Sequence, residues 1–276
     1  MKHTVVYLAH DEIPILTGMK NLLQATWSAR LVGWNLLRDR TARRYSGSLL
    51  GVAWSVLSPL LTLIAIALIF PLLMRMRMEN YVVYLFSGLI VWRFVVSSLK
   101  VGGESVLSNK VLVQKVALPS LLYPVVVTLS EFINFILVFL SLNVVGMFLD
   151  FVVSPHWGYF ALAAAVTLLF CIGLAAVFSV TVVYFRDIKH IVDVITQAFF
   201  YLTPIIYPIS MIPEQYRVYL DLNVFMHFVE LFHQAIYFQG EVDWSLFVIP
   251  STLALLTFFL GVFVHVKWGK MLVYHV

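Results

Sequence analysis

Three residues with metal-binding side chains lie within one short segment of this sequence. His227, Glu230 and His233 are spaced three residues apart, and imidazole and carboxylate groups are common ligands of zinc. On a helix, however, a rotation of about 100° per residue spreads these side chains around the axis instead of directing them to one point. The spacing therefore favours polar residues at an interface, and we predict no metal site here.

Two charged residues fall inside long apolar runs. Arg93 and Glu131 would each cost about 2.5–3.5 kcal/mol near the centre of a membrane span, unless they are paired or hydrated. At about 1.5 Å per residue, Arg93 lies roughly 9 Å and Glu131 roughly 15 Å from the cytoplasmic ends of their spans. These depths on consecutive spans predict either an ion pair between the two or two charges that face one water-filled path.

The sequence lacks the common motifs of hydrolytic enzymes. It contains no Walker-type phosphate loop, no His-Glu-x-x-His motif and no Gly-x-Ser-x-Gly elbow. We therefore predict no catalytic, cofactor-binding or metal site and expect that the chain is not an enzyme. Energy from ATP and its Mg²⁺ ion would enter through another chain. A membrane-embedded transferase is the least favoured function, because no convergent catalytic set is present.

Aromatic residues make up 15% of the chain. Most tryptophan and tyrosine residues near the ends of spans are expected to form the aromatic belt of a membrane protein. Some could instead line a path for sugars, because pyranose rings stack their C–H faces on aromatic rings. The candidates for such a lining are Trp54, Phe70, Trp92, Phe199, Phe200 and Tyr201.

Helices in lipid must position these side chains. Of the 276 residues, 62% are hydrophobic and only 12% are charged, whereas soluble domains carry about 25% charged residues. One globular core cannot bury this excess, so the sequence predicts an all-α integral membrane protein. The net charge of +4 is modest, and nucleic acid is not an expected partner.

Six apolar segments predict transmembrane helices within a domain that covers residues 48–270. Residues 209–239 are apolar but interrupted by prolines and charges, which predicts two short re-entrant helices before the last span. Gly47 and Gly51 would let another helix approach the first span closely, within the subunit or in a dimer. The predicted spans are residues 49–73, 81–99, 121–149, 159–185, 191–208 and 246–266.

Residues 1–47 are predicted to form a cytoplasmic arm. Within it, five apolar residues recur at helical spacing and predict an amphipathic helix that lies in the membrane interface. Four arginines that follow are candidates for binding lipid head groups, although anchoring on the cytoplasmic side is the simpler explanation. The apolar residues are Leu23, Trp27, Leu31, Trp34 and Leu37, and the arginines are Arg38, Arg40, Arg43 and Arg44.

Basic residues set the predicted orientation, because cytoplasmic segments carry most of the lysine and arginine of a membrane protein. With both termini inside, 14 of the 18 Lys and Arg residues lie on the cytoplasmic side. This orientation also places a polar segment at 102–118 and a short tail at 271–276 in the cytoplasm.

Four sequence blocks occur in the order found in one transporter family. Together they resemble the membrane subunits of type-2 ABC exporters, most closely the branch that exports O-antigen, capsule and teichoic acid. The resemblance covers roughly residues 20–270. The blocks are residues 44–59 (RYSGSLLGVAWSVLSP), 109–119 (NKVLVQKVALP), 184–192 (YFRDIKHIV) and 201–208 (YLTPIIYP).

The resemblance implies a homodimer in the bacterial inner membrane, with six spans and two re-entrant helices per subunit. It also implies that two copies of a cytoplasmic ABC ATPase dock on the coupling segment at 102–118 and on the N-terminal helix. The candidates for this contact are Glu104, Asn109, Lys110, Gln114 and Lys115.

We therefore predict export of a lipid-linked polysaccharide from the cytoplasmic side outward, through a channel that the homodimer forms in membrane lipid. One alternative is an ABC exporter permease for teichoic acid or for a small lipid or drug, which shares the fold. A second alternative is a proton-coupled secondary transporter that uses Glu131 and Asp193.

Overall fold

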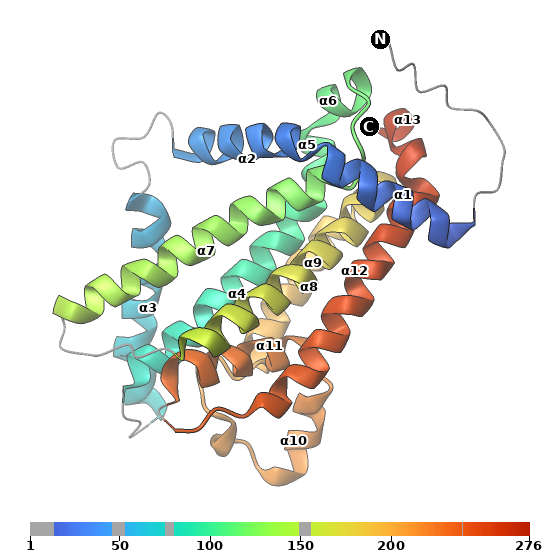
Figure 1. The fold of residues 1–276 in the computed structure, drawn as a ribbon. Coiled ribbons are helices and arrows are strands. Elements are labelled where there is room, and N and C mark those ends of the chain that lie inside the picture. Colours follow the sequence, from blue (N-terminus) through green and yellow to red (C-terminus); the bar gives the residue numbers. More distant parts are fainter. Residues whose placement is uncertain (1–13, 46–52, 75–79, 149–155, 239) are drawn as a thin grey trace.

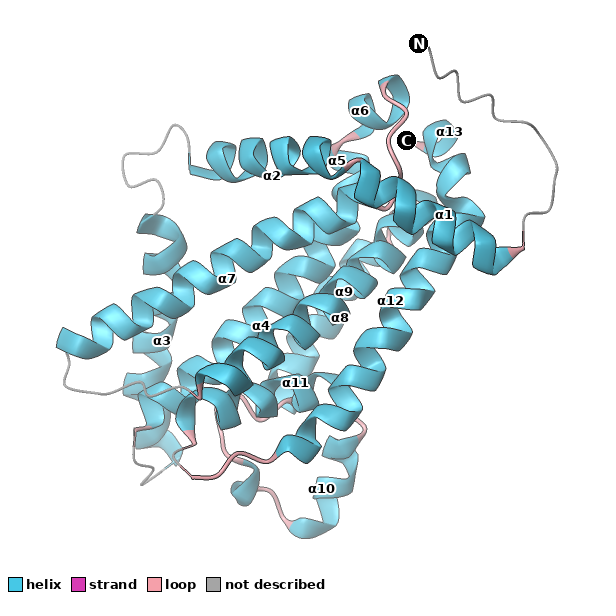
Figure 2. Ribbon diagram, viewed as in Figure 1, coloured by secondary structure: helices cyan, strands magenta, loops and turns pink. Residues whose placement is uncertain are grey.

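The architecture was determined from a computed structural model, which describes residues 14–45, 53–74, 80–148, 156–238 and 240–276. Throughout these ranges the regular elements are helices, and none of the described residues forms a strand (Figure 2). This confirms the predicted all-α class. The predicted glycine pair Gly47 and Gly51 lies outside the described ranges.

Long helices form the body of the molecule (Figure 1). Each consists almost entirely of apolar residues, so every face of these helices can lie against another helix or against lipid. The helix α8 packs against three of the other long helices, namely α4, α7 and α12. The long helices are α3 (Ala53–Met74), α4 (Tyr81–Gly103), α7 (Leu122–Phe148), α8 (Trp157–Tyr184) and α12 (Val248–Trp268).

Four helices in the described part of the chain are long and apolar enough to cross a membrane. They comprise α4, α8, residues Leu122–Ser141 of α7, and the stretch Trp244–His275 that contains α12, and they coincide with four of the predicted spans. The apolar part of α3 that qualifies is shorter, Leu60–Phe70, and α9 (Ile188–Leu202) has only 15 residues. The count of six spans therefore stays a prediction.

Two glycines allow α8 and α12 to approach closely. A Cβ atom at Gly173 on α8 would lie 2.4 Å from the carbonyl carbon of Thr257 on α12. On the other helix, a Cβ atom at Gly261 would lie 2.9 Å from the carbonyl oxygen of Gly173 and 2.7 Å from the Cβ atom of Ala176. Small residues of this kind let helix backbones touch and gain dispersion energy in lipid.

The N-terminal region forms two helices, α1 (Ile15–Ser28) and α2 (Arg30–Tyr45), that lie across one end of the bundle (Figure 1). The chain turns at Ala29 because the two helices follow different partners. On α1, Gly18 lies against α12, whereas Gly33 of α2 lies against α7.

The predicted apolar stripe is divided between these two helices. Leu37 on α2 is buried against α7, and Leu23 on α1 is half-buried against a cluster that includes residues of α7, α8 and α12. Trp27, Leu31 and Trp34 are 70%, 72% and 63% exposed, which suits a helix pair whose outer face lies in a membrane interface.

Short helices cover both ends of the bundle. The helices α5 (Ser105–Ser108), α6 (Lys110–Lys115) and α13 (Leu272–His275) lie at the same end as α1 and α2, while α10 (Glu214–Asp221) lies at the other end (Figure 1). The helix α11 (Val224–Phe232) precedes one turn of π-helix, and much of it is buried in the core. Helices therefore occur where re-entrant helices are predicted, and their re-entry into the membrane stays a prediction.

A proline-containing turn connects α9 to the end of the bundle that carries α10. The Tyr84 hydroxyl donates hydrogen bonds to the carbonyl oxygens of Pro204, at 3.0 Å, and Tyr207, at 3.1 Å. The Tyr81 hydroxyl donates to the carbonyl oxygen of Ile206 at 2.8 Å. Proline cannot continue the helix, and these buried tyrosines satisfy backbone oxygens that the broken helix leaves without partners.

Candidate functional site

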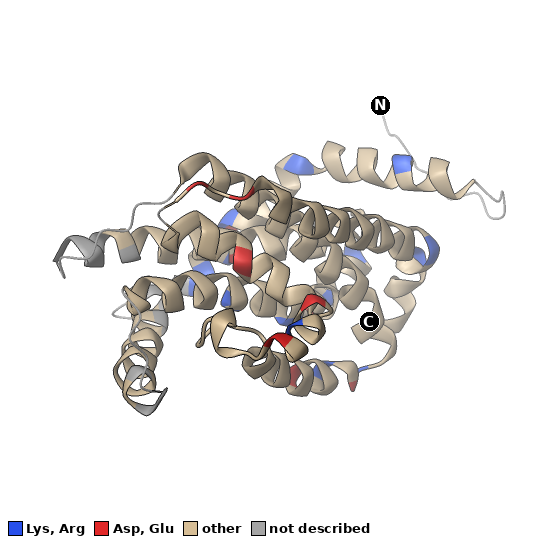
Figure 3. Ribbon diagram, turned by 90° about the horizontal axis from the view of Figure 1, so that it is seen from below, with Lys and Arg blue, Asp and Glu red and all other residues tan. Residues whose placement is uncertain are grey.

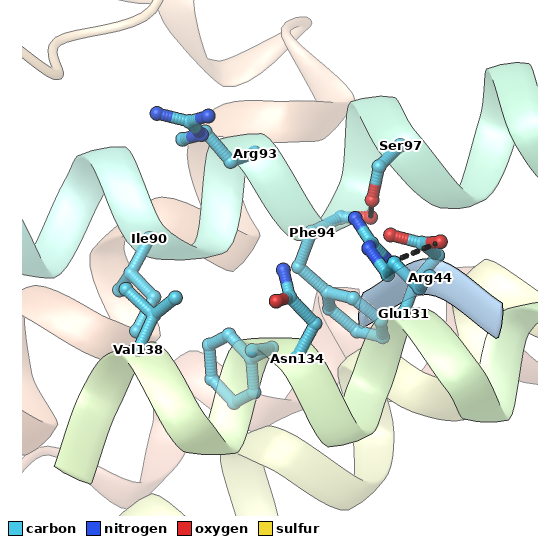
Figure 4. Close-up of a pocket in the computed structure, with 9 residues that line it drawn as sticks. Arg44, Ile90, Arg93, Phe94, Ser97, Glu131, Asn134 and Val138 are labelled. Atoms are coloured by element: carbon cyan, nitrogen blue, oxygen red, sulfur yellow. Dashed lines mark hydrogen bonds and ion pairs between the residues drawn. The ribbon is translucent and has the colours of Figure 1, made fainter. Parts of the chain in front are cut away.

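A cavity of about 90 Å³ lies between α4, α7 and the C-terminal end of α2 (Figure 4). Its lining carries two arginines and one glutamate, whereas most residues of the surrounding helices are apolar. Ionisable groups inside spans usually pair with one another or mark the route of a substrate. The lining consists of Arg44, Ile90, Arg93, Phe94, Ser97, Glu131, Asn134, Phe135 and Val138.

Glu131 forms an ion pair with Arg44. The distance between Arg44 Nη1 and Glu131 Oε1 is 2.8 Å, and the glutamate side chain is only 3% exposed while that of the arginine is 38% exposed. Because α2 packs along α7 through Leu37, its last turn carries Arg44 over the glutamate. The predicted pair between Arg93 and Glu131 is therefore wrong, because Arg44 from the N-terminal arm forms the ion pair with Glu131.

Arg93 lines the same cavity but points away from the ion pair (Figure 4). Among the described residues, no hydrogen bond or ion pair reaches its guanidinium group. It also lines a smaller adjoining pocket, together with Thr62 and Leu63 of α3. The structure thus places both predicted intramembrane charges on one cavity, with only one of them compensated.

The four arginines at the end of the arm have different surroundings. Arg44 faces Glu131, whereas Arg38 and Arg43 are exposed. Burial lowers the pKa of Arg40 below its ordinary value, and the charge of nearby Glu131 opposes this shift. A role in binding lipid head groups stays a prediction for all four.

Four of the six aromatic residues proposed to line a path are linked by ring contacts near the end of α9. The Trp92 ring lies edge-on to Phe225 at 5.4 Å and 5.9 Å from Phe200, measured between centroids. Phe199 also meets Phe225, and Phe200 meets Tyr201. The other two candidates, Trp54 and Phe70, belong to α3. Phe225, which joins two of these aromatic residues, is not among the predicted candidates.

The predicted coupling segment forms α5 and α6, which continue from α4 after Glu104. Asn109 Nδ2 donates a hydrogen bond of 2.7 Å to the carbonyl oxygen of Ser105. Lys110 and Lys115 are exposed, and Gln114 Nε2 donates a hydrogen bond of 2.7 Å to the backbone oxygen of Val276.

The short helix α13 supports this segment. Its Leu272 is fully buried in a cluster with Val106 of α5, Val113 of α6 and Val183 of α8. Sequence reasoning missed this contact because a single leucine in a four-residue helix leaves no periodic pattern.

An ion pair joins the helix that precedes the coupling segment to α9. Lys100 Nζ lies 2.7 Å from Asp193 Oδ1, and the two side chains are 38% and 56% exposed. Only Val192 and Thr196 of α9 are buried. This pair is therefore one of few contacts that hold the N-terminal half of α9 against α4.

His265 links three segments near the C-terminal end of α12. Its Nδ1 atom lies 2.9 Å from the Ser120 hydroxyl, and its Nε2 atom lies 3.1 Å from both the Ser179 hydroxyl and the carbonyl oxygen of Ala176. The side chain is 2% exposed. A buried histidine with partners on both nitrogens is a structural link between α12, α8 and the segment just before α7, and no motif or spacing indicates it.

The three residues considered as metal ligands do not converge. His227 Nε2 lies 2.9 Å from the carbonyl oxygen of Asp221. His233 Nδ1 lies 3.6 Å from Glu230 Oε2, and its ring stacks on Tyr84 with 4.0 Å between centroids. These side chains contribute to packing at the end of the bundle that carries α10.

Comparison with known proteins gives the site its context. The family model described as "ABC-2 type transporter" matches residues 33–237. The O-antigen export system permease protein RfbA of Myxococcus xanthus is 28% identical over 226 residues, which cover 81% of this chain and 86% of that protein.

Two further relatives support the same match. A protein of the same name from Klebsiella pneumoniae is 33% identical over 184 residues, covering 65% of this chain and 70% of that protein. The polysialic acid transport protein KpsM of Escherichia coli is 23% identical over 197 residues, covering 70% of this chain and 76% of that protein. Residues 33–237, which the family model matches, include the whole cavity lining.

Proposed function

Because this chain belongs to the ABC-2 type transporter family, we propose that it forms half of the channel of an ATP-driven exporter for a lipid-linked polysaccharide. The observation that carries this proposal is the similarity to permeases named for O-antigen export in two organisms. The named substrates of these relatives are large glycans, which favours the polysaccharide over teichoic acid or a small lipid or drug.

The charge distribution supports an orientation with both termini in the cytoplasm. At the end of the bundle that carries α10, the described acidic residues outnumber the basic ones, and Figure 3 looks onto this end. Among described residues the only lysine or arginine there is Arg217. The opposite end carries the basic residues of α1, α2, α6 and the end of α12, as expected for the cytoplasmic side of a bacterial inner-membrane protein.

The ATPase is proposed to be a separate chain, with ATP and Mg²⁺ bound to it. In support, the sequence has no phosphate loop, and α6 presents exposed lysines at the basic end of the bundle. ATP binding on the partner would push α5 and α6, which continue from α4. The contacts between α4 and α9, which include the exposed ion pair between Lys100 and Asp193, would together pass this movement on to α9.

A second copy of the chain is proposed to complete the channel. The helix α9 buries only two of its residues in the monomer, and Ile191, Val194 and Ile195 are 54%, 69% and 46% exposed. An apolar face of this kind suits contact with a second copy or with lipid.

The proposal is tested by purifying the permease with its ATPase and reconstituting the complex in liposomes. We expect the two chains to copurify and a lipid-linked polysaccharide to stimulate ATP hydrolysis. Hydrolysis that is indifferent to every lipid-linked glycan, or failure of the chains to associate, would contradict the proposal.

Reversing two charges on α6 tests its role in ATPase docking. The double variant Lys110→Glu with Lys115→Glu is expected to weaken ATPase binding at least about tenfold, because charges at an interface steer and orient the partner. Both side chains are exposed, so the melting temperature of the permease alone should change little. Affinity is measured by titrating labelled ATPase onto the permease in nanodiscs.

The matched control reverses a charge at the opposite end. Glu241→Lys changes an exposed residue near the outer end and should leave ATPase affinity unchanged. Equal weakening by both variants would show that α6 has no specific role.

Neutralising Asp193 separates the proposed function from proton-coupled transport. Asp193→Asn is expected to retain at least about half of the ATP-driven transport, because an exposed ion pair contributes less than about 1 kcal/mol and Asp193 is 56% exposed. A proton carrier would lose its activity entirely. Transport is measured in proteoliposomes with ATP present and with a proton gradient alone, and activity driven by the gradient alone would favour the secondary transporter.

A further inference from the structure

The cavity carries one positive charge that no described residue compensates. Arg44 and Glu131 neutralise each other at 2.8 Å, so the remaining charge of the lining is that of Arg93. A lone guanidinium inside a span costs about 2.5–3.5 kcal/mol on insertion scales. An anion in the cavity would remove much of this cost.

Hydrogen-bonding groups near Arg93 suit an oxygen-rich anion. The guanidinium offers five N–H donors in a fixed plane, which match two oxygens of a phosphate or carboxylate. Asn134 and Arg44 also line this cavity, but Arg44 is paired with Glu131 and Arg93 points away from that pair (Figure 4), so Arg93 is the donor on which the site depends. With about 90 Å³ available, the cavity is large enough for one small oxyanion but not for a sugar chain.

The surroundings of Arg93 are amphipathic. An adjoining pocket shares Ile90, Arg93 and Val138 with the cavity, and its other walls are mostly apolar. They comprise Thr62 and Leu63 of α3 and Phe86 and Leu89 of α4. This adjoining pocket measures only about 10 Å³, so a ligand with its charged group at Arg93 would run its hydrocarbon chain over these apolar walls and outside the pocket.

We propose that this cavity is a binding site for the phosphate group of an anionic lipid, with Arg93 as its principal ligand. Anionic amphiphiles of membranes are largely phosphate esters, and basic pockets between transmembrane helices bind their head groups. A membrane phospholipid and the phosphate of an exported lipid-linked molecule share this chemistry. The proposal therefore goes beyond the proposed function and holds for either source.

The test measures lipid binding to the full-length permease in an uncharged detergent, by native mass spectrometry and by thermal shift. The probe is short-chain phosphatidylglycerol, and diacylglycerol with the same chains serves as the control that lacks phosphate. The permease variants are Arg93→Gln, Arg93→Lys and Arg186→Gln. The last removes an exposed positive charge of the cytoplasmic surface and controls for non-specific attraction of anions.

We expect saturable binding of phosphatidylglycerol to the unmodified protein and to Arg186→Gln. Arg93→Gln should bind about tenfold to a hundredfold more weakly, because it loses charge-assisted hydrogen bonds. Arg93→Lys keeps the charge but lacks the planar guanidinium group. Its affinity for phosphatidylglycerol should lie between that of the unmodified protein and that of Arg93→Gln. Diacylglycerol should bind equally weakly to all variants.

Binding of phosphatidylglycerol to Arg93→Gln with unchanged affinity would overturn the proposal, as would equal binding of diacylglycerol to the unmodified protein. Arg93 is exposed, so its glutamine variant should keep the elution profile and melting temperature of the folded protein. If Arg93→Gln does not fold, the comparison of the two probes on Arg93→Lys still decides the outcome.

Two further probes distinguish the source of the phosphate. Inorganic phosphate with the same affinity as the lipid would overturn the amphiphilic part of the proposal. Tighter binding of farnesyl phosphate than of phosphatidylglycerol would support an exported lipid as the ligand, and the reverse would support a membrane phospholipid. Because no ATPase is present, a negative result leaves the proposed export function untouched.

Discussion

Replacing Arg44 with leucine is expected to destabilise the folded protein by about 3 kcal/mol, since it leaves the carboxylate of Glu131 buried without its partner. The glutamate is 3% exposed, so only the water that the cavity admits could replace the lost guanidinium. Replacing Glu131 with leucine should cost less, because the Arg44 side chain is 38% exposed and can turn towards solvent. The difference between the two single variants is measured by thermal unfolding in detergent.

The double variant decides between a true pair and two separate effects. Arg44→Leu with Glu131→Leu should be more stable than Arg44→Leu alone, because removing both charges together is often neutral. Additive losses in the double variant would show that the two residues do not interact in the folded protein. The reversed pair, Arg44→Glu with Glu131→Arg, should recover part of the stability for the same reason.

Adding a single methyl group at Gly173 is expected to destabilise the helix bundle by about 3 kcal/mol, the upper range for overpacking a core. The new Cβ atom of Gly173→Ala would lie 2.4 Å from the carbonyl carbon of Thr257 and 2.5 Å from the backbone nitrogen of Phe258. These are backbone atoms of α12 that no rotamer change can move, so α8 and α12 must separate. The measurement is the fraction of monodisperse protein after solubilisation, together with its melting temperature.

A control for this prediction lies on the same helix. Gly158 belongs to the first turn of α8, and a Cβ atom there would meet no atom within 4 Å. Gly158→Ala should therefore be as stable as the unmodified protein or more stable by up to about 1 kcal/mol, from helix propensity. Equal stability of the two alanine variants would contradict the close packing of α8 and α12.

The positions of the long helices could be predicted because hydrophobic length is a local property. The predicted spans at 81–99, 121–149, 159–185 and 246–266 agree with α4, α7, α8 and α12 to within a few residues at most ends. A long run of apolar side chains is stable as a helix in lipid, whichever other helices pack beside it. Polar residues mark the ends of these helices, and their position is also visible in the local sequence.

Periodicity predicted helical structure in the arm but not its division. The spacing from Leu23 to Leu37 is that of one helix, yet the chain turns at Ala29. The turn follows from the contacts of α1 with α12 and of α2 with α7, which join segments far apart in the sequence. No pattern inside the arm encodes those contacts.

The candidate site shows the same limit. Sequence alone identified Arg93 and Glu131 as costly charges, because the free energy of a charge in a span depends on its depth and not on its partner. It did not identify Arg44 as the partner of Glu131, since the two are 87 residues apart and meet only when α2 lies along α7.

By itself, the sequence determined that this chain is a helical membrane protein, and its ordered motifs placed it near the polysaccharide exporters. The tertiary structure decided which charges pair, that Arg93 is left facing a cavity, and that Gly173 and Gly261 set the spacing of two helices. Apolar length and helical period act over a few residues, whereas an ion pair or a cavity exists only where distant helices meet.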